Sequence, residues 1–299
     1  MTPASPKTAT PPQMNGEGVV AWLREWQLAL PLALAFAAPL LMLVAVTFFN
    51  DDKITQPGIA QWVKFFGDPF HYKVIVDTLL LGVKTVCATV IVGYPLALVF
   101  IDLSPRLQKV LIFIIVLPLL LSVVVRTFAW IVVLGREGLV NTLLMKLGLI
   151  SEPLRLLQTE LGLVISLTQI EMPLMLLPLI SVMSRLDPNL RDASAALGAS
   201  RWRTLFTVIV PLSMPGLVAG CLLVFASATT AFISQTVIGG VRLIYLPLLI
   251  WQQSLVVFNW PFAAVASLSL VVSVLTVIAA LTWVGRRYVP EDRGGAIHG

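Results

Sequence analysis

Long apolar runs dominate the pattern along the chain, and short polar stretches separate them. Six runs reach roughly 20 residues, the length that an α-helix needs to cross the hydrocarbon core of a bilayer. Stretches such as VLIFIIVLPLLLSVVV (110–125) lack alternation of apolar and polar positions, which argues against the strands of a membrane β-barrel. The pattern predicts an all-α polytopic membrane protein with six transmembrane helices. The predicted spans lie at about 27–49, 75–101, 110–134, 161–183, 209–233 and 262–285.

Composition agrees with a position in lipid. The chain is 58% hydrophobic and 12% charged, which is about half the charge of a typical soluble domain. Residues 1–17 are rich in Pro, Thr and Ser and predict a disordered cytosolic tail. The first apolar run is too long for the hydrophobic part of a cleaved signal peptide, so we expect it to stay in the membrane.

The positive charges orient the predicted spans. With the N-terminus inside, eleven Lys and Arg residues fall on the inner side and seven on the outer side, while Lys84 and Arg126 lie within spans. The positive-inside rule therefore places both termini in the cytosol, including a second tail at 286–299. The sequence pI of about 9.5 reflects this orientation, so we expect no nucleic-acid partner.

Three shorter segments carry separate predictions. The first is either an interfacial helix on the inner leaflet or the solvent-exposed end of the first span, and its sequence is GVVAWLREWQL (18–28). Apolar residues at helical spacing in 139–149 predict a short outer helix. Residues 243–257 are too short to span and contain Pro247, so we expect a re-entrant or interfacial segment packed against protein.

The residues needed for catalysis or metal binding are missing. His71 and His298 are the two histidines, and neither has a Cys, Asp or Glu set suited to a metal. We find no base and orienting group beside a Ser or Thr nucleophile. No Gly-Lys pair occurs, so the chain lacks a phosphate-binding P-loop. Cys87 and Cys221 fall within spans and predict buried thiols. The sequence indicates a conduit without catalytic residues, metal or cofactor.

Four ionisable side chains fall within the predicted spans: Asp77, Lys84, Arg126 and Glu171. Each costs a few kcal/mol in lipid unless it faces water or a partner. Asp77 and Lys84 share a helix face and could be a structural pair. Arg126 lies near the outer mouth with Trp130 one turn on, and Glu171 lies about 15 Å deep at 1.5 Å per residue. We take Asp77, Arg126, Trp130 and Glu171 as a candidate translocation path, although an Arg126–Glu171 pair would also satisfy both charges.

The segment DASAALGASRWRTLFTVIVP (192–211) falls in the predicted cytosolic loop between spans four and five. It resembles the EAA loop of ABC-importer permeases of the binding-protein-dependent type: Glu-Ala-Ala, three residues, Gly, nine residues, Ile, one residue and Leu-Pro. Asp192, Ala193 and Ser194 take the first places, and Gly198 takes the glycine. Val208 takes the isoleucine place, and the pattern ends at Pro211.

The resemblance implies a docking role for the loop at about 184–211. In the family, this loop forms two short helices that dock in a cleft of the cytosolic ATPase subunit. A glycine at 198 permits the sharp turn between them. Phe206, Val208 and Ile209 would offer an apolar face, and the two arginines could meet an acidic surface. The residues that we assign to coupling are Asp192, Ala193, Ser194, Gly198, Arg201, Arg203, Phe206, Val208 and Pro211.

The resemblance extends over about residues 25–285, which implies a permease domain at 18–285 with the type I ABC importer permease fold. VVVRTFAWIVVLGREGLVNTLL (123–144) and VFNWPFAAVAS (257–267) are similar to the first permease of the polyamine and opine subgroup. Span four of that subgroup usually lacks a charge at the position of Glu171. The resemblance implies a multi-pass protein of a bacterial inner membrane. Its implied partners are a dimer of cytosolic ATPase subunits, a periplasmic binding protein and a second, related six-helix permease.

Two functions remain open from the sequence. The first is import of a small polar organic solute by alternating access, driven by a separate ATPase, with polyamine, opine and amino-acid-like solutes all possible. The second is a stand-alone ion-coupled secondary transporter that uses Asp77 or Glu171 as its ion site. The ATPase-docking loop favours the first function, because a gradient-driven carrier does not need it.

Overall fold

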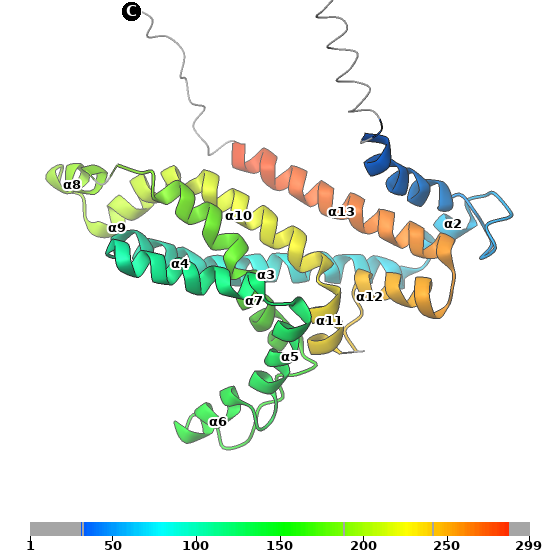
Figure 1. The fold of residues 1–299 in the computed structure, drawn as a ribbon, viewed down its shortest axis with the longest axis horizontal. Coiled ribbons are helices and arrows are strands. Elements are labelled where there is room, and N and C mark those ends of the chain that lie inside the picture. The colour runs from blue at the N-terminus through cyan, green and yellow to red at the C-terminus, as the bar shows by residue number, and fades with distance from the viewer. Residues whose placement is uncertain (1–30, 32, 188, 241, 287–299) are drawn as a thin grey trace, which may run out of the picture.

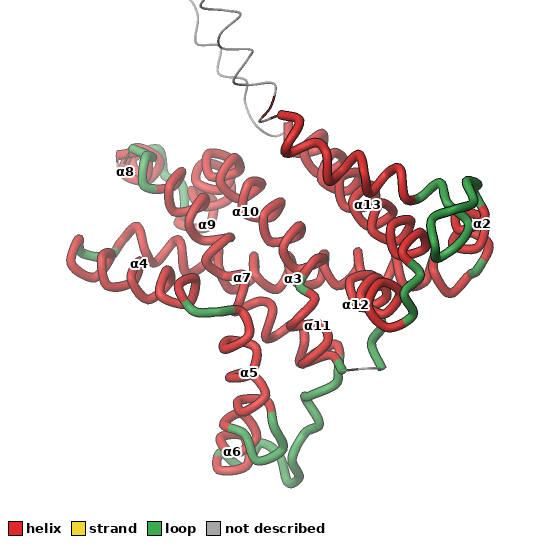
Figure 2. The backbone as a smooth tube through the Cα atoms, turned by 45° about the vertical axis from the view of Figure 1, so that its right-hand side comes forward, coloured by secondary structure: helices red, strands yellow, loops and turns green. Residues whose placement is uncertain are grey.

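The protein is described by a computed structural model that covers residues 31, 33–187, 189–240 and 242–286. Every regular element in this part of the chain is a helix, apart from an isolated β-bridge between Phe49 and Pro57. Figure 2 shows the helices and the loops that join them. The predicted tail at 1–17, the predicted interfacial helix at 18–28 and the tail at 287–299 lie outside the described residues.

The helices follow one another in the order seen in Figure 1. After an apolar helix at Ala33–Val46 come α2 (Ala60–Gly67), α3 (Pro69–Asp102), α4 (Pro105–Leu120), α5 (Val123–Leu134), α6 (Leu139–Lys146), α7 (Glu160–Met183), α8 (Asn189–Ala196) and α9 (Arg201–Thr204). They are followed by the π-helix η1 (Leu205–Ile209), α10 (Val210–Thr230), α11 (Phe232–Gly239), α12 (Leu246–Trp251), the π-helix η2 (Gln252–Val256) and α13 (Trp260–Arg286).

Four helical segments in the described residues are long and apolar enough to cross a bilayer. They are Pro69–Asp102, Glu160–Met183, Arg201–Thr230 and Trp260–Trp283, and they overlap predicted spans two, four, five and six. A bent helix pair would make a fifth, whereas the described part of the first predicted span is the shorter helix Ala33–Val46. The count of six spans and the cytosolic termini therefore stay predictions.

The third predicted span, 110–134, is not one continuous helix. α4 ends at Leu120 and α5 begins at Val123, with a bend of 104° between Pro105–Leu120 and Val123–Lys146. Pro118 lacks the amide hydrogen that would continue the helical ladder, and Leu121 adopts extended backbone angles. The Ser122 side chain then accepts a hydrogen bond from the Val124 amide and starts α5 as its N-cap. As a result, α5 and α6 project sideways from the bundle (Figure 1).

α7 is the central helix of the bundle. It packs against α3, α10 and α11, and most of its apolar side chains are buried. Its N-cap is Thr159, whose hydroxyl accepts from the Gly162 amide at 3.2 Å. α10 approaches α7 closely through Gly216 and Gly220, one helical turn apart on the same face. Small residues at this spacing let two membrane helices pack backbone to backbone.

The predicted re-entrant segment at 243–257 forms α12 and η2, which are together too short to span. Leu246, Pro247, Leu248 and Leu249 are buried. The Leu246 amide donates to the Thr78 hydroxyl of α3 at 3.0 Å, which fixes the start of α12 to the bundle. α6 coincides with the helix predicted at 139–149.

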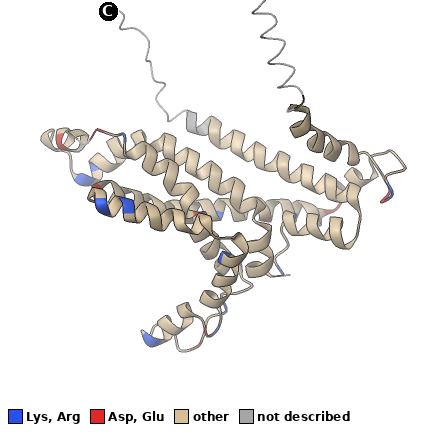
Figure 3. Ribbon diagram, viewed as in Figure 1, with Lys and Arg blue, Asp and Glu red and all other residues tan. Residues whose placement is uncertain are grey.

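The two ends of the bundle differ. α8 and α9 lie at one end with the start of α4, and α2 lies at the other (Figure 1). Lysine and arginine gather at the end that carries α4, α8 and α9, as Figure 3 shows. At the α2 end, hydrogen bonds from the Thr55 hydroxyl and the Gln56 amide hold the pKa of the Asp51 carboxyl below its usual value.

The cysteines differ from the prediction in one respect. Both thiols are free, as expected, but Cys87 is exposed on the surface of α3 and Cys221 is partly exposed. The prediction of buried thiols is thus wrong for Cys87, because an apolar run does not reveal which of its faces meets protein and which meets lipid.

Candidate functional site

The segment predicted as a coupling loop folds as two short helices around a glycine turn. α8 ends at Ala196, and Gly198 adopts φ +79°, a conformation that side chains other than glycine rarely take. The Gly198 amide donates to the Ala195 carbonyl at 2.9 Å, and the Ala199 amide donates to the Ser194 carbonyl at 3.1 Å. These two bonds form a Schellman cap. The predicted turn at Gly198 is therefore present.

The second half of the loop continues directly into the membrane bundle. The Ser200 hydroxyl accepts from the Arg203 amide at 3.3 Å and starts α9. Helical structure then runs without a break from Arg201 to Thr230 through η1 and α10. Pro211, which has no amide hydrogen to donate, follows directly after the π-helical turn η1. Ser194 and Thr204 share a hydrogen bond of 2.8 Å between their hydroxyls, so α8 is tied to this continuous segment.

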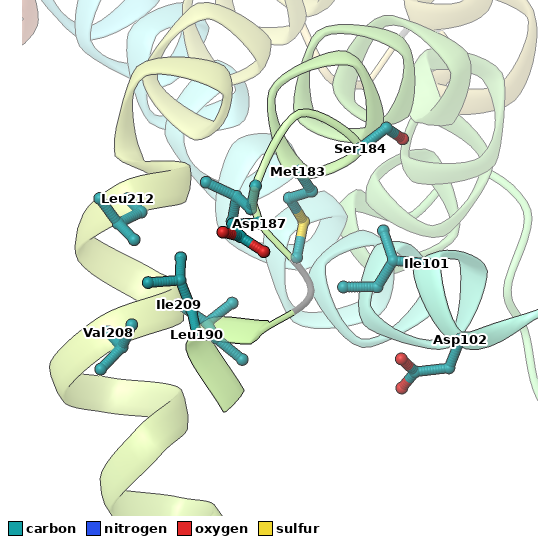
Figure 4. Close-up of a pocket in the computed structure, with 10 residues that line it drawn as sticks. Ile101, Asp102, Met183, Ser184, Asp187, Leu190, Val208, Ile209 and Leu212 are labelled. Carbon is teal, nitrogen blue, oxygen red and sulfur yellow. The ribbon is translucent and has the colours of Figure 1, made fainter. Parts of the chain in front are cut away.

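Two hollows lie between the loop and the bundle. One, of about 230 Å³, is lined by residues from the ends of α3 and α7, from α8, and from η1 and α10 (Figure 4). Asp192 and Arg201 line a second hollow of about 430 Å³, without an ion pair between them in the described chain. The space between α8 and the bundle is therefore not completely filled by side chains.

The outward face of the loop is apolar. Leu197 is 89% exposed, Trp202 is 71% exposed and Phe206 is 64% exposed, and the last two rings stack at 6.2 Å between centroids. The predicted face was only partly right, because Ile209 is buried and lines both hollows together with other bundle residues. Ile209 thus holds the loop to the bundle, and Leu197 and Trp202 are the residues that the sequence reasoning missed.

A second candidate site is a cavity of about 420 Å³ at the breaks between α4 and α5 and between α10 and α11. We call it the broken-helix cavity. α4 and α5 meet there at the bend, α7 passes it, and α10 gives way to α11 at Ala231, which has ψ 60°. Its lining residues are Leu119, Val123, Arg126, Ile170, Glu171, Leu174, Ser227, Thr230, Ala231, Phe232, Ile233 and Ser234.

Arg126 and Glu171 are the two charged residues of this lining. Arg126 Nη1 donates to the Ile170 carbonyl at 3.3 Å, while its buried Nε has no hydrogen-bond partner in the described structure. Glu171 is only 5% exposed, and the polar groups that act on it are the Ser227 hydroxyl and the Arg126 guanidinium. The alternative of a direct Arg126–Glu171 ion pair is not seen, since the one ion pair among the described residues joins Lys84 and Glu160.

The other two candidates of the translocation path lie elsewhere. Trp130 donates from Nε1 to the Gln169 side chain at 3.0 Å and does not line the cavity. Asp77 lies within electrostatic range of Tyr245. The alternative of a structural pair with Lys84 is not seen, because Lys84 Nζ bonds to Glu160 Oε1 at 2.5 Å. Glu160 begins the next long helix, a partner that helix spacing within α3 cannot reveal.

Comparison with known proteins places this geometry in a family. Residues 89–289 match the model of the family described as binding-protein-dependent transport system inner membrane component. The spermidine/putrescine transport system permease protein PotB of Haemophilus influenzae is 34% identical over 239 residues, which cover 78% of this chain and 83% of that protein. PotB of Escherichia coli K12 is 30% identical over 244 residues, covering 81% and 89% respectively.

Solved structures show the same fold. A bacterial ABC transporter involved in import of the acidic polysaccharide alginate aligns with TM-score 0.72 and 18% identity, over 91% of this chain and 98% of that one. The alginate transporter in complex with its alginate pentasaccharide-bound periplasmic protein aligns with TM-score 0.68 and 18% identity, over 92% and 97%. The chain thus has the fold of an ABC importer permease, and by its match over residues 89–289 it belongs to the family of binding-protein-dependent transport system inner membrane components.

Proposed function

We propose that this chain, a permease subunit of an ATP-binding-cassette importer of a bacterial inner membrane, passes its solute through the broken-helix cavity and receives the ATPase on the loop at 184–211. The single observation that carries the proposal is the continuous helical segment Arg201–Thr230. One end of this segment carries the exposed Trp202 and Phe206, and the other end contributes Ser227 and Thr230 to the cavity. A movement imposed on the loop would therefore reach the cavity through one helix.

The physical chemistry of the loop supports a protein partner. Leu197, Trp202 and Phe206 are large, exposed and apolar, with Arg201 and Arg203 beside them. Exposed clusters of this kind next to basic residues mark interaction surfaces rather than ordinary solvent-facing loops. We assign the partner as a dimer of ATPase subunits that hydrolyse ATP, so this chain itself supplies no catalytic residue, metal or cofactor.

The remaining partners follow from the geometry of transport. The six helices predicted from the sequence would be too few to enclose the pore expected for this family, so we propose a second, related permease chain. A periplasmic binding protein would deliver solute at the α2 end of the bundle, as one accompanies the alginate transporter. The solute is a small polar organic molecule, for which the names of the relatives suggest a polyamine, with opine-like and amino-acid-like molecules as the other classes.

The source of energy tests this function against a gradient-driven carrier. In proteoliposomes that hold the complete importer, uptake from the loaded binding protein should require ATP on the ATPase side and should persist with ionophores that collapse ion gradients. The control is an importer whose ATPase subunits bind but cannot hydrolyse ATP. Uptake by this chain without an ATPase, following an ion gradient, would favour the secondary transporter instead.

The docking surface has its own test. Phe206→Ser should lower co-purification of the ATPase subunits with the permease at least fivefold, because it removes an exposed apolar contact and breaks the stack on Trp202. Phe66→Ser is the matched control. Phe66 is 40% exposed and also stacks on a tryptophan, Trp62, but it lies on α2 at the opposite end of the bundle. Equal ATPase recovery with the two variants would remove Phe206 from the docking surface.

A further inference from the structure

We propose that the solute taken through the broken-helix cavity carries both an anionic carboxylate and a cationic ammonium group, the first bound by Arg126 and the second by Glu171. This inference rests on the proposed role of the cavity as the solute path. It concerns the chemical class of the solute, and it differs from the polyamine class that the names of the relatives suggest.

Arg126 has unused capacity for an anion. Its Nη1 donates to the Ile170 carbonyl at 3.3 Å, but Nε is buried and has no hydrogen-bond partner in the described structure. Guanidinium is a planar fork of five donors that matches the geometry of a carboxylate. A buried donor left unpaired is costly, so a solute carboxylate at this position would satisfy a group that the protein leaves open.

Glu171 has unused capacity for a cation. Its side chain is only 5% exposed, and no described Lys or Arg nitrogen lies within ion-pair distance of its carboxylate. The Ser227 hydroxyl offers Glu171 a dipole without charge, and the Arg126 guanidinium acts on it from beyond ion-pair distance. Buried carboxylates in membrane segments usually pair with a cation or mark a substrate path. An ammonium group of the solute would supply a cation at ion-pair distance.

The helix ends around the cavity reinforce the assignment of the two sites. Val123 and Arg126 lie at the start of α5, and Ser234 lies at the start of α11. Thr127 and Ser234 share a hydrogen bond of 3.1 Å, so the two helix N-termini meet beside Arg126. Helix N-termini carry partial positive charge and favour anions, and interrupted helices of transporters use them in this way. Arg126 and the two helix starts therefore act in the same direction.

The same charges disfavour solutes of one sign. A diamine would bring one ammonium toward Arg126, and a dicarboxylate would bring one carboxylate toward Glu171. Repulsion between like charges is strong where water is scarce. A competing explanation is that Arg126 and Glu171 simply neutralise each other at longer range. That explanation predicts that uptake recovers when both residues are changed to glutamine together.

The test uses the complete importer in proteoliposomes with three labelled probes of equal carbon number. Putrescine carries two ammonium groups, 4-aminobutyrate carries one ammonium and one carboxylate, and succinate carries two carboxylates. We expect 4-aminobutyrate to be accumulated at least tenfold more than either other probe. Preferential uptake of putrescine or succinate, or uptake of none of the three, would overturn the proposal. ATP hydrolysis stimulated by the binding protein is read in the same vesicles, so a failure of the importer as a whole is distinguished from a wrong solute class.

Two neutral variants test the residue assignments. Arg126→Gln should lower 4-aminobutyrate uptake at least tenfold and should reduce the ratio of 4-aminobutyrate to putrescine uptake. Glu171→Gln should reduce the ratio of 4-aminobutyrate to succinate uptake. Leu177→Met, a change without charge on α7 at a half-exposed position outside the cavity lining, should leave both ratios unchanged. An equal loss of all three probes in each charge variant would indicate a structural role and contradict the proposal. Recovery of 4-aminobutyrate uptake in the double variant would support mutual neutralisation and overturn it.

Discussion

Replacing Gly198 with valine is expected to lower ATP-driven uptake at least a hundredfold while the chain remains in the membrane. Gly198 has φ +79°, and a β-branched residue is strained there by about 1–3 kcal/mol. The strain is relieved most easily by a change in the backbone at the end of α8. Such a change would break the Gly198–Ala195 and Ala199–Ser194 hydrogen bonds and alter the angle between α8 and α9.

The effect should be confined to the loop, because a Cβ at Gly198 would meet no other heavy atom within 4 Å. No steric conflict with the bundle is created, and the helices from α3 to α7 keep their packing. The variant should therefore insert and purify at normal yield but fail to co-purify with the ATPase. The measurements are ATP-dependent uptake in proteoliposomes and the amount of ATPase recovered with the permease.

Gly148→Val is the matched control for this prediction. Gly148 also has a positive φ, +72°, and also has open space around its Cβ position. It ends α6 in the same kind of helix cap, with Gly148 and Leu149 amides donating to Met145 and Leu144 carbonyls. It lies far along the chain from the loop at 184–211. Similar loss of uptake in the two variants would show that backbone strain alone, and not coupling, explains the result at Gly198.

The long helices could be predicted from the sequence because a membrane span needs only length and apolar composition. α3, α7, α10 and α13 follow directly from those two properties. The break between α4 and α5 was missed, although its signals were present. Pro118 and Ser122 stand four residues apart within LPLLLSVVV, a helix-terminating residue followed by an N-cap residue. A hydropathy pattern measures the length of an apolar run but not its direction.

The loop at 184–211 was predicted in more detail than the cavity. Its resemblance to the EAA loop identified the turn at Gly198 and implied the two flanking helices, whose local geometry depends on nearby residues. The π-helix η1 and the burial of Ile209 depend on packing against α3 and α7, so they could not be read from the segment alone. Trp202 could have been recognised, since a large apolar side chain between two arginines of a short loop has no lipid to cover it.

The charged residues of the spans show where sequence reasoning ends. Their burial costs predicted that each has a partner or a function, but not which one. Lys84 forms an ion pair with Glu160 on α7 and not with Asp77 on its own helix. Arg126 of α5 and Glu171 of α7 line the same cavity, but their side chains form no direct ion pair. These partners depend on how helices distant in sequence pack, and that information is tertiary.

Substitution of Gly216 is expected to produce a large loss of stability where α10 packs against α7. A Cβ at this position would lie 2.8 Å from the Pro178 carbonyl oxygen and 3.0 Å from Leu179 Cα. Both are backbone atoms of α7, so neither can move away without displacing the helix. Overpacking of this kind costs about 1–3 kcal/mol for modest additions, and Gly216→Leu adds a full side chain. We expect a fall of several degrees in the thermal unfolding midpoint of the purified permease, with lower membrane yield.

Two further glycine substitutions show whether the loss of stability comes from steric conflict at Gly216 or from any substitution of a glycine in the protein. At Gly93 of α3, a Cβ would lie 3.3 Å from the side chains of Met172 and Met175, which are flexible and can shift, so Gly93→Ala should be nearly neutral. Gly67→Leu supplies the same substitution at a position with nothing within 4 Å and should leave the midpoint unchanged. Because α7 carries Glu171 and α10 carries Ser227, loosening the contact at Gly216 should also widen the broken-helix cavity. Full stability of Gly216→Leu would mean that α7 and α10 are not in backbone contact at Gly216. The proposal that movement of the loop reaches the cavity through a segment packed against α7 would then lose this support.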